Sequence, residues 1–172
     1  MRLTLASTPR HPASRSYRFG VLEAIDIVLI HQLLGRYGHL IDARDWDRFG
    51  ELFVPDATID YRSTTGRVER AGRTAIIDWF SGLDESHPPA HYVSNIVVDE
   101  TADAADRVGV DSKFIAPYTR ANHVPKRLYG GDYHDVVVKS SDRWQFAHKQ
   151  CIPTWQLAVM TDATAPDHRL TY

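Results

Sequence analysis

The sequence predicts an α+β fold, in which helices come first along the chain and a curved antiparallel sheet follows. Two observations support this prediction. Apolar residues recur at helical spacing in the first half of the 172-residue chain, and alternating β-branched runs fill the second half, after Pro88 and Pro89. A long sheet of this kind wraps around the leading helices as a cone, and the interior of a cone is a natural place for a ligand.

The helical half begins with a strongly apolar stretch. Ile27, Ile30, Leu34, Tyr37 and Ile41 share one face at the i, i+3/i+4 spacing. A capping aspartate and a following proline then delimit a second, short helix. We therefore expect helices at residues 23–41, 46–53 and 74–83. A short strand at 57–61 and a polar turn or hairpin at 62–72 separate the second helix from the third.

The second half reads as four strands joined by polar connections. We expect these strands at residues 91–98, 107–118, 128–139 and 143–152. No internal repeat or interdomain linker interrupts them. The predicted organisation is one domain at 21–156, preceded by a flexible arm at 1–20 and followed by a tail at 157–172.

Composition excludes several function classes. The net charge is −2 and the basic residues are scattered, which argues against binding to nucleic acid or to an anionic membrane surface. The single Cys151 excludes an internal disulfide and a multi-cysteine zinc site, and favours a cytoplasmic location. No apolar run reaches the roughly 18 residues of a membrane span. No histidine pair has ligand spacing on one predicted element, so we expect no metal.

The segment from Leu40 to Ser63 carries the most specific signal, because it places a carboxylate, Asp42, at the end of the first helix and a phenol, Tyr61, in a strand. Asp42 faces the negative end of the helix dipole, so a histidine arriving from a strand would stabilise its charge. His91, at the start of a predicted strand, is a plausible general base. Each residue also has a plainer interpretation: a surface acid held by Arg44, a core histidine, and an ordinary strand tyrosine.

The run Asp42-Ala-Arg-Asp-Trp-Asp-Arg48, followed by Ile59-Asp-Tyr-Arg-Ser63, resembles the SnoaL-like branch of the nuclear-transport-factor-2-like (NTF2-like) superfamily, and within it the scytalone dehydratases. The resemblance in element order covers residues 23–156. It implies the NTF2-like cone and an acid–base site. By position, Asp42 matches an aspartate that orients a histidine, His91 matches that histidine, and Tyr61 matches a tyrosine that polarises a substrate carbonyl through water.

Two departures from the family pattern separate this chain from a scytalone-specific site. Ile41 stands where the family has a second tyrosine, and Tyr118 is nearest to the family's second histidine. Strand alternation allows either Asp132 and His134, or Tyr133 and Asp135, to face inward. The tail with Trp155 falls where the family places a segment that closes the pocket. The candidate substrate-binding residues are Tyr37, Asn95, Tyr118, Asp132, His134 and Trp155.

The sequence therefore predicts a cofactor-independent dehydratase or isomerase that acts on a small apolar or polycyclic carbonyl compound. His91 would remove a proton, Asp42 would hold the imidazole, and Tyr61 would stabilise the enolate. Two alternatives stay open: a non-catalytic module that binds small molecules, and the small β subunit of a ring-hydroxylating oxygenase. The Val- and Ile-rich sheet face predicts a homodimer or homotrimer.

Overall fold

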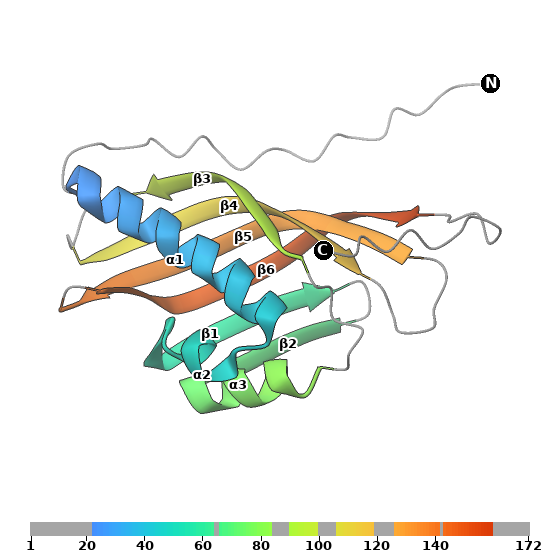
Figure 1. Cartoon of the computed structure of the whole chain (residues 1–172), viewed down its shortest axis with the longest axis horizontal. Coiled ribbons are helices and arrows are strands. Elements are labelled where there is room, and N and C mark those ends of the chain that lie inside the picture. Colours follow the sequence, from blue (N-terminus) through green and yellow to red (C-terminus); the bar gives the residue numbers. More distant parts are fainter. Residues whose placement is uncertain are drawn as a thin grey trace, which may run out of the picture.

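The structure is a computed structural model of the chain, and it describes residues 22–63, 66–83, 90–99, 106–118, 126–141 and 143–159. Within these ranges three helices precede or interrupt a single sheet (Figure 1). The helices are α1 (Ala24–Ala43), α2 (Trp46–Gly50) and α3 (Arg73–Ser81). The three predicted helices are confirmed, with ends that differ from the prediction by at most three residues.

Helix α1 is long because its apolar stripe continues without a breaker, and it buries Ile30, Leu34, Tyr37 and Ile41. It ends at Arg44, which adopts the left-handed conformation (φ 54°) and donates its backbone N–H to a carbonyl of the last turn. The end of the helix is thereby fixed, and Asp42 lies in the last turn. No helix in the described ranges is both long enough and apolar enough to cross a membrane.

Six strands form the sheet within the described residues, in the order β2-β1-β6-β5-β4-β3. Helix α1 lies across one face of the curved sheet, and α2 and α3 lie beside β1 and β2 (Figure 1). The strands are β1 (Phe53–Ser63), β2 (Gly66–Ala71), β3 (Tyr92–Asp99), β4 (Arg107–Tyr118), β5 (Lys126–Ser140) and β6 (Arg143–Val159). The α+β cone is thus confirmed.

The direction of one strand pair differs from the sequence prediction. The prediction was an antiparallel sheet, but β1 pairs with β6 in parallel, with Tyr61 opposite Cys151. The other neighbours are antiparallel. Because β1 and β6 are the first and last strands along the chain, no local pattern in either strand could reveal their relative direction. The sheet is therefore mixed.

Strand β6 is also longer than predicted. It continues through Pro153 to Val159, because a register shift opposite Gly130 and Gly131 accommodates the extra residue. Residues 157–159 of the predicted tail thus belong to this strand. The rest of that tail, at 160–172, and the predicted arm at 1–20 lie outside the described residues.

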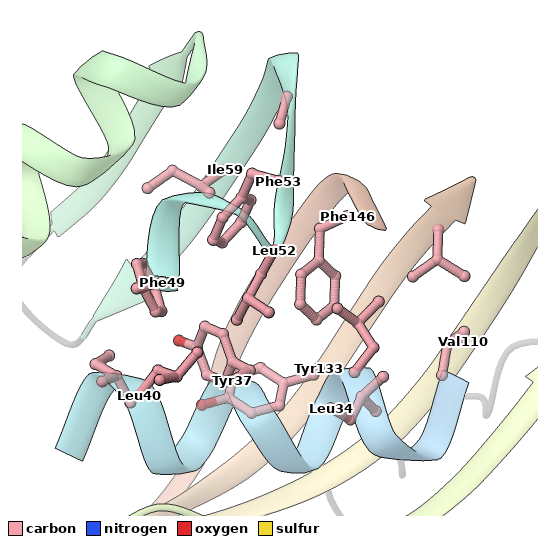
Figure 2. Packing of buried hydrophobic residues seen from close by; sticks show 14 of the residues in the cluster. Leu34, Tyr37, Leu40, Phe49, Leu52, Phe53, Ile59, Val110, Tyr133 and Phe146 are labelled. Atoms are coloured by element: carbon pink, nitrogen blue, oxygen red, sulfur yellow. The ribbon is translucent and has the colours of Figure 1, made fainter. Parts of the chain in front are cut away.

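Aromatic side chains from both halves of the chain pack with aliphatic ones in the core between α1 and the sheet (Figure 2). The ring of Phe49 lies 5.5 Å from that of Tyr37, and Phe53 lies 5.3 Å from Phe146, measured between centroids. Tyr133 reaches from β5 toward Tyr37 on α1, with 5.9 Å between the ring centroids. Tyr37 therefore occupies the centre of the core.

Candidate functional site

The site is built around a pair formed by Asp42 and His91. His91 directly precedes β3, and its Nδ1 lies 2.6 Å from one carboxylate oxygen of Asp42. The backbone N–H of His91 donates to the other carboxylate oxygen at 2.8 Å. The His91 side chain is only 7% exposed and that of Asp42 20%. Two contacts to one carboxylate fix both the position and the ring orientation of the histidine.

This arrangement decides which nitrogen of His91 can act as a base. An ionised carboxylate only accepts hydrogen bonds, so the nitrogen that faces it carries the proton. The lone pair of the neutral ring is then on Nε2. Asp42 also stabilises the imidazolium that forms when Nε2 takes up a proton. The pair thus has the geometry of an oriented general base.

Gly38 lets the histidine approach the helix. A Cβ atom at this position would lie 3.0 Å from the carbonyl oxygen of His91, which is closer than ordinary van der Waals contact. Gly38 and Asp42 are four residues apart and therefore share one face of α1. His91 packs against the backbone of Gly38 and the carboxylate of Asp42, which together fix its position on α1.

A cluster of tyrosine hydroxyl groups lies next to this pair. The rings of Tyr37 and His91 meet edge to face, with 6.3 Å between centroids. The hydroxyl of Tyr37 is hydrogen-bonded to the hydroxyl of Tyr61, and the ring of Tyr133 lies 5.9 Å from that of Tyr37, measured between centroids. Burial raises the pKa of all three phenols above their ordinary value. They are therefore neutral and able to donate hydrogen bonds.

Tyr61 reaches this cluster from the sheet. Its ring packs against Trp79 and Phe80 of α3, at 5.1 and 5.5 Å between centroids. Tyr61 is partly buried, whereas Tyr37 is 1% and Tyr133 2% exposed. Tyr61 is thus the most exposed of the three tyrosines. The structure brings together Asp42, His91, Tyr37 and Tyr61 through consecutive contacts.

A buried ion pair lies on the inner face of the sheet, with Lys149 against the rings of Tyr37 and Tyr133. Lys149 Nζ of β6 is 2.9 Å from Asp135 Oδ2 of β5. Burial raises the pKa of Asp135, and the neighbouring Lys149 ammonium partly offsets that effect. Sequence reasoning singled out neither Lys149 nor Gly38. A signal for Gly38 existed, because a glycine within a helical pattern often marks a close approach of another chain segment.

Cys151 is a further buried side chain that carries a potential nucleophile. It is 6% exposed and lies opposite both Tyr61 and Tyr133 in the sheet register. Burial raises the pKa of its thiol to about 12. Because the thiolate is the reactive form of cysteine, this side chain is chemically inert at neutral pH.

The alternation along β5 is settled by burial. Tyr133 and Asp135 are buried on the inner face, whereas His134 is exposed and Asp132 is partly exposed. Asp132 pairs with Lys113, and His134 lies 2.7 Å from Asp111. The structure therefore corrects the candidate pair for the inner wall from Asp132 and His134 to Tyr133 and Asp135.

Of the remaining predicted substrate-binding residues, Asn95 lies on the edge strand β3, whereas Tyr118 and Trp155 lie at or near the ends of the inner strands β4 and β6. Asn95 is exposed and adopts the left-handed conformation (φ 51°) where the β3–β4 register shifts. Trp155 is 46% exposed, and its ring covers Gly130 of β5 so closely that a Cβ there would clash. Tyr118 is the last residue of β4. The structure does not bring Asn95 or Trp155 into contact with the Asp42–His91 pair.

The described residues contain no group of three or more His, Cys, Asp or Glu side chains that could hold a metal ion. The residues that converge on His91 are instead a carboxylate and phenols. This donor set is suited to moving a proton and to stabilising a developing oxyanion.

Comparison with known proteins agrees with the fold. The family model described as a SnoaL-like domain matches residues 23–150. An uncharacterised protein of Mycobacterium tuberculosis (strain ATCC 25618 / H37Rv) is 32% identical over 133 residues, which covers 75% of this chain and 86% of that protein.

Two solved structures illustrate the similarity in three dimensions. A candidate scytalone dehydratase from Novosphingobium aromaticivorans superposes with a TM-score of 0.69 at 22% identity, over 86% of this chain and 96% of that chain. A hexachlorocyclohexane dehydrochlorinase, LinA-type3 from Novosphingobium barchaimii, gives a TM-score of 0.69 at 14% identity, over 83% and 95%. At these identities, the similarity to the two structures concerns the fold.

Proposed function

The chain belongs to the SnoaL-like family, and we propose that it is a cofactor-independent acid–base enzyme that removes a proton next to a carbonyl group. The observation that carries the proposal is the two-point contact of His91 with Asp42, at 2.6 Å from the ring and 2.8 Å from the backbone. A module that only binds ligands gains nothing from an oriented histidine–carboxylate pair in an apolar setting.

The proposed reaction begins at His91. Its Nε2 takes the proton from the carbon next to the carbonyl, and the electrons of that C–H bond form the enolate C=C bond. The negative charge then develops on the carbonyl oxygen, where the Tyr61 hydroxyl donates a hydrogen bond, directly or through a water molecule. Asp42 stabilises the imidazolium during this step.

The fate of the enolate depends on the substrate. When a hydroxyl group is positioned on the β carbon, the enolate electrons return and expel it, while the imidazolium supplies the proton that makes the leaving group water. The net reaction is a dehydration. When no leaving group is present, return of the proton to another carbon gives an isomer. Structural neighbours named as a dehydratase and a dehydrochlorinase support the elimination branch.

The test follows the first step alone, so it requires no knowledge of the leaving group. β-Hydroxyketones and cyclic enones are incubated with the protein in D₂O, and NMR follows exchange of the protons next to the carbonyl. We expect the wild-type protein to catalyse exchange, and H91Q to lower the rate by roughly 10²- to 10⁴-fold. H134Q is the matched control, because His134 forms a similar pair with Asp111 elsewhere on the sheet.

Equal exchange rates in wild type and H91Q across the panel would contradict the proposal. The non-catalytic binding module would then be the better description of the protein. Saturable binding of the same compounds, measured by calorimetry, would support that alternative.

A further inference from the structure

Lys149 and Asp135 form an ion pair that is unusually deep in the protein. The two side chains are 1% and 0% exposed, and the nitrogen–oxygen distance is 2.9 Å. They face each other across neighbouring strands, β6 and β5, in the sheet register. Charged residues are almost never buried to this degree unless they are paired, and even then the cost of removing both from water is high.

The ammonium group of Lys149 is surrounded by aromatic faces. Its Nζ lies 3.7 Å from the ring centroid of Tyr133, 4.2 Å from that of Tyr37 and 4.8 Å from that of Phe146. Tyr37 and Tyr133 lie side by side between α1 and the sheet (Figure 2). The charge is therefore applied to the tyrosine cluster that adjoins His91.

The pair is a poor device for stability alone. Asp135 Oδ1 and the hydroxyl of Ser112, on β4, are both buried and have no hydrogen-bond partner among the described residues. A buried ion pair stabilises a fold only when its remaining lone pairs are satisfied, and apolar residues of similar volume often serve as well or better. Because these two polar atoms lack hydrogen-bond partners, we infer that the buried charge has a role other than stability.

We propose that Lys149, held in place by Asp135, is a positioning residue that applies a positive charge to the tyrosine cluster and strengthens the hydrogen bond that Tyr61 donates to the enolate oxygen. The inference rests on the proposed function of the same site. Lys149 does not touch the substrate in this arrangement, because Tyr37 lies between it and Tyr61.

The physical link runs through the ring of Tyr37. A cation against the face of a phenol withdraws electron density from it and makes its hydroxyl a stronger donor. When Tyr37 donates to the oxygen of Tyr61, the Tyr61 hydroxyl becomes a stronger donor in turn, because hydrogen bonds in a chain polarise one another. The effect is greatest when negative charge develops on the acceptor, as it does in the enolate.

The test uses a probe that mimics the enolate, 4-nitrophenol, whose ionised and neutral forms differ in absorbance. We compare the wild-type protein with the double variant K149M/D135L, which removes both charges together and leaves no uncompensated charge in the core. Circular dichroism and thermal unfolding establish that the variant is folded. K113Q/D132N is the matched control, since it removes an exposed ion pair between the neighbouring strands β4 and β5.

We expect the wild-type protein to bind the ionised phenol in preference to the neutral one. Loss of the buried charge should lower the ionisation constant of the bound phenol by about tenfold, with a smaller change in the affinity for the neutral form. Y61F should lose the preference as well, and K113Q/D132N should retain it. In the wild type, the proton shared by Tyr37 and Tyr61 should resonate further downfield in ¹H NMR than in the double variant.

Two outcomes would overturn the inference. A folded double variant that retains the full preference for phenolate would make the pair purely structural, and a wild-type protein without any preference would remove the effect to be explained. Neither measurement depends on proton removal by His91. A failure here therefore differs from a failure of the proposed function, which appears as loss of the difference between wild type and H91Q in deuterium exchange.

Discussion

Two histidine–aspartate pairs in this protein have almost the same geometry and different surroundings. His91 lies 2.6 Å from Asp42, and His134 lies 2.7 Å from Asp111. The side chains of the first pair are 7% and 20% exposed, whereas those of the second are 49% and 33% exposed. A short distance between ring and carboxylate is thus not what sets the candidate site apart.

The surroundings make the difference. His91 packs against Gly38, contacts the ring of Tyr37 and donates a second hydrogen bond to Asp42 from its backbone N–H. His134 lines a hollow of about 330 Å³ together with Arg107, His148 and Gln150. Exposed to water, a charge interaction of this kind is screened and weak.

The largest expected effect comes from replacing the carboxylate of each histidine–aspartate pair by an amide. D42N should lower the deuterium-exchange rate by roughly 10²- to 10⁴-fold, because the amide cannot accept from both the ring and the backbone of His91 or stabilise the imidazolium. D111N should leave the rate unchanged. Long-range ¹H–¹⁵N NMR should show a defined tautomer of His91 in the wild type and in D111N. A D42N protein with wild-type exchange would mean that the inner pair is not catalytic.

The second comparison concerns the lysines of a buried ion pair, Lys149–Asp135, and of an exposed one, Lys113–Asp132. K149M should lower the free energy of unfolding by about 3–5 kcal/mol, because it leaves the Asp135 carboxylate buried without its charged partner. K113M, which breaks the exposed pair with Asp132, should cost about 0–1 kcal/mol. Urea denaturation measures both. Similar values for the two variants would contradict the burial difference on which the comparison depends.

A smaller effect is expected at two glycines of α1. G35A should raise the free energy of unfolding by about 1 kcal/mol, because alanine favours the helix and a Cβ at Gly35 meets nothing within 4 Å. G38A gains the same helix propensity but presses on the His91 carbonyl. It should leave stability nearly unchanged and slow exchange by about tenfold through displacement of the base. Equal deuterium-exchange rates in G35A and G38A would show that catalysis tolerates a displacement of His91.

The mildest expected effect is a pH dependence that arises outside the candidate site. Hydrogen bonds from Arg67, at 2.6 and 2.9 Å, hold the pKa of Asp60 well below its usual range. An acid with a lowered pKa in the folded state contributes stability above its unfolded pKa of about 3.9, and that contribution is lost as the pH falls. D60N should therefore flatten the decline in thermal stability below about pH 4. If D60N loses thermal stability below about pH 4 as steeply as the wild type, the lowered pKa of Asp60 does not contribute to the acid sensitivity.

Much of the fold was predictable from the sequence. The apolar stripe of α1, the cap at Asp45 and the alternation of the later strands are local patterns, so the elements they mark were expected close to their observed positions. The parallel pairing of β1 with β6 was not, since it joins strands from opposite ends of the chain. The extension of β6 through Pro153 depends on a shift of its register opposite Gly130 and Gly131 of β5. The residues of β6 alone do not reveal that shift.

The candidate site was predictable in part. Asp42 and Tyr61 lie in the motif that resembles the SnoaL-like family, and His91 matches the family histidine by position; the structure places Asp42 against His91, and Tyr37 against both His91 and Tyr61. Asp132 and His134 were placed on the wrong face, because alternation fixes only that neighbours along a strand face opposite ways and not which of them faces the core.

The sequence by itself determined which segments are helical, which are extended, and that a carboxylate ends the first helix. These properties depend on side-chain spacing and capping, which act over a few residues. Only the tertiary structure decided that His91 of one segment and Asp42 of another share a hydrogen bond, and that the charge of Lys149 lies against Tyr37 and Tyr133. Such contacts depend on strand order and register across the whole sheet, and so does the burial that separates the inner His–Asp pair from the outer one.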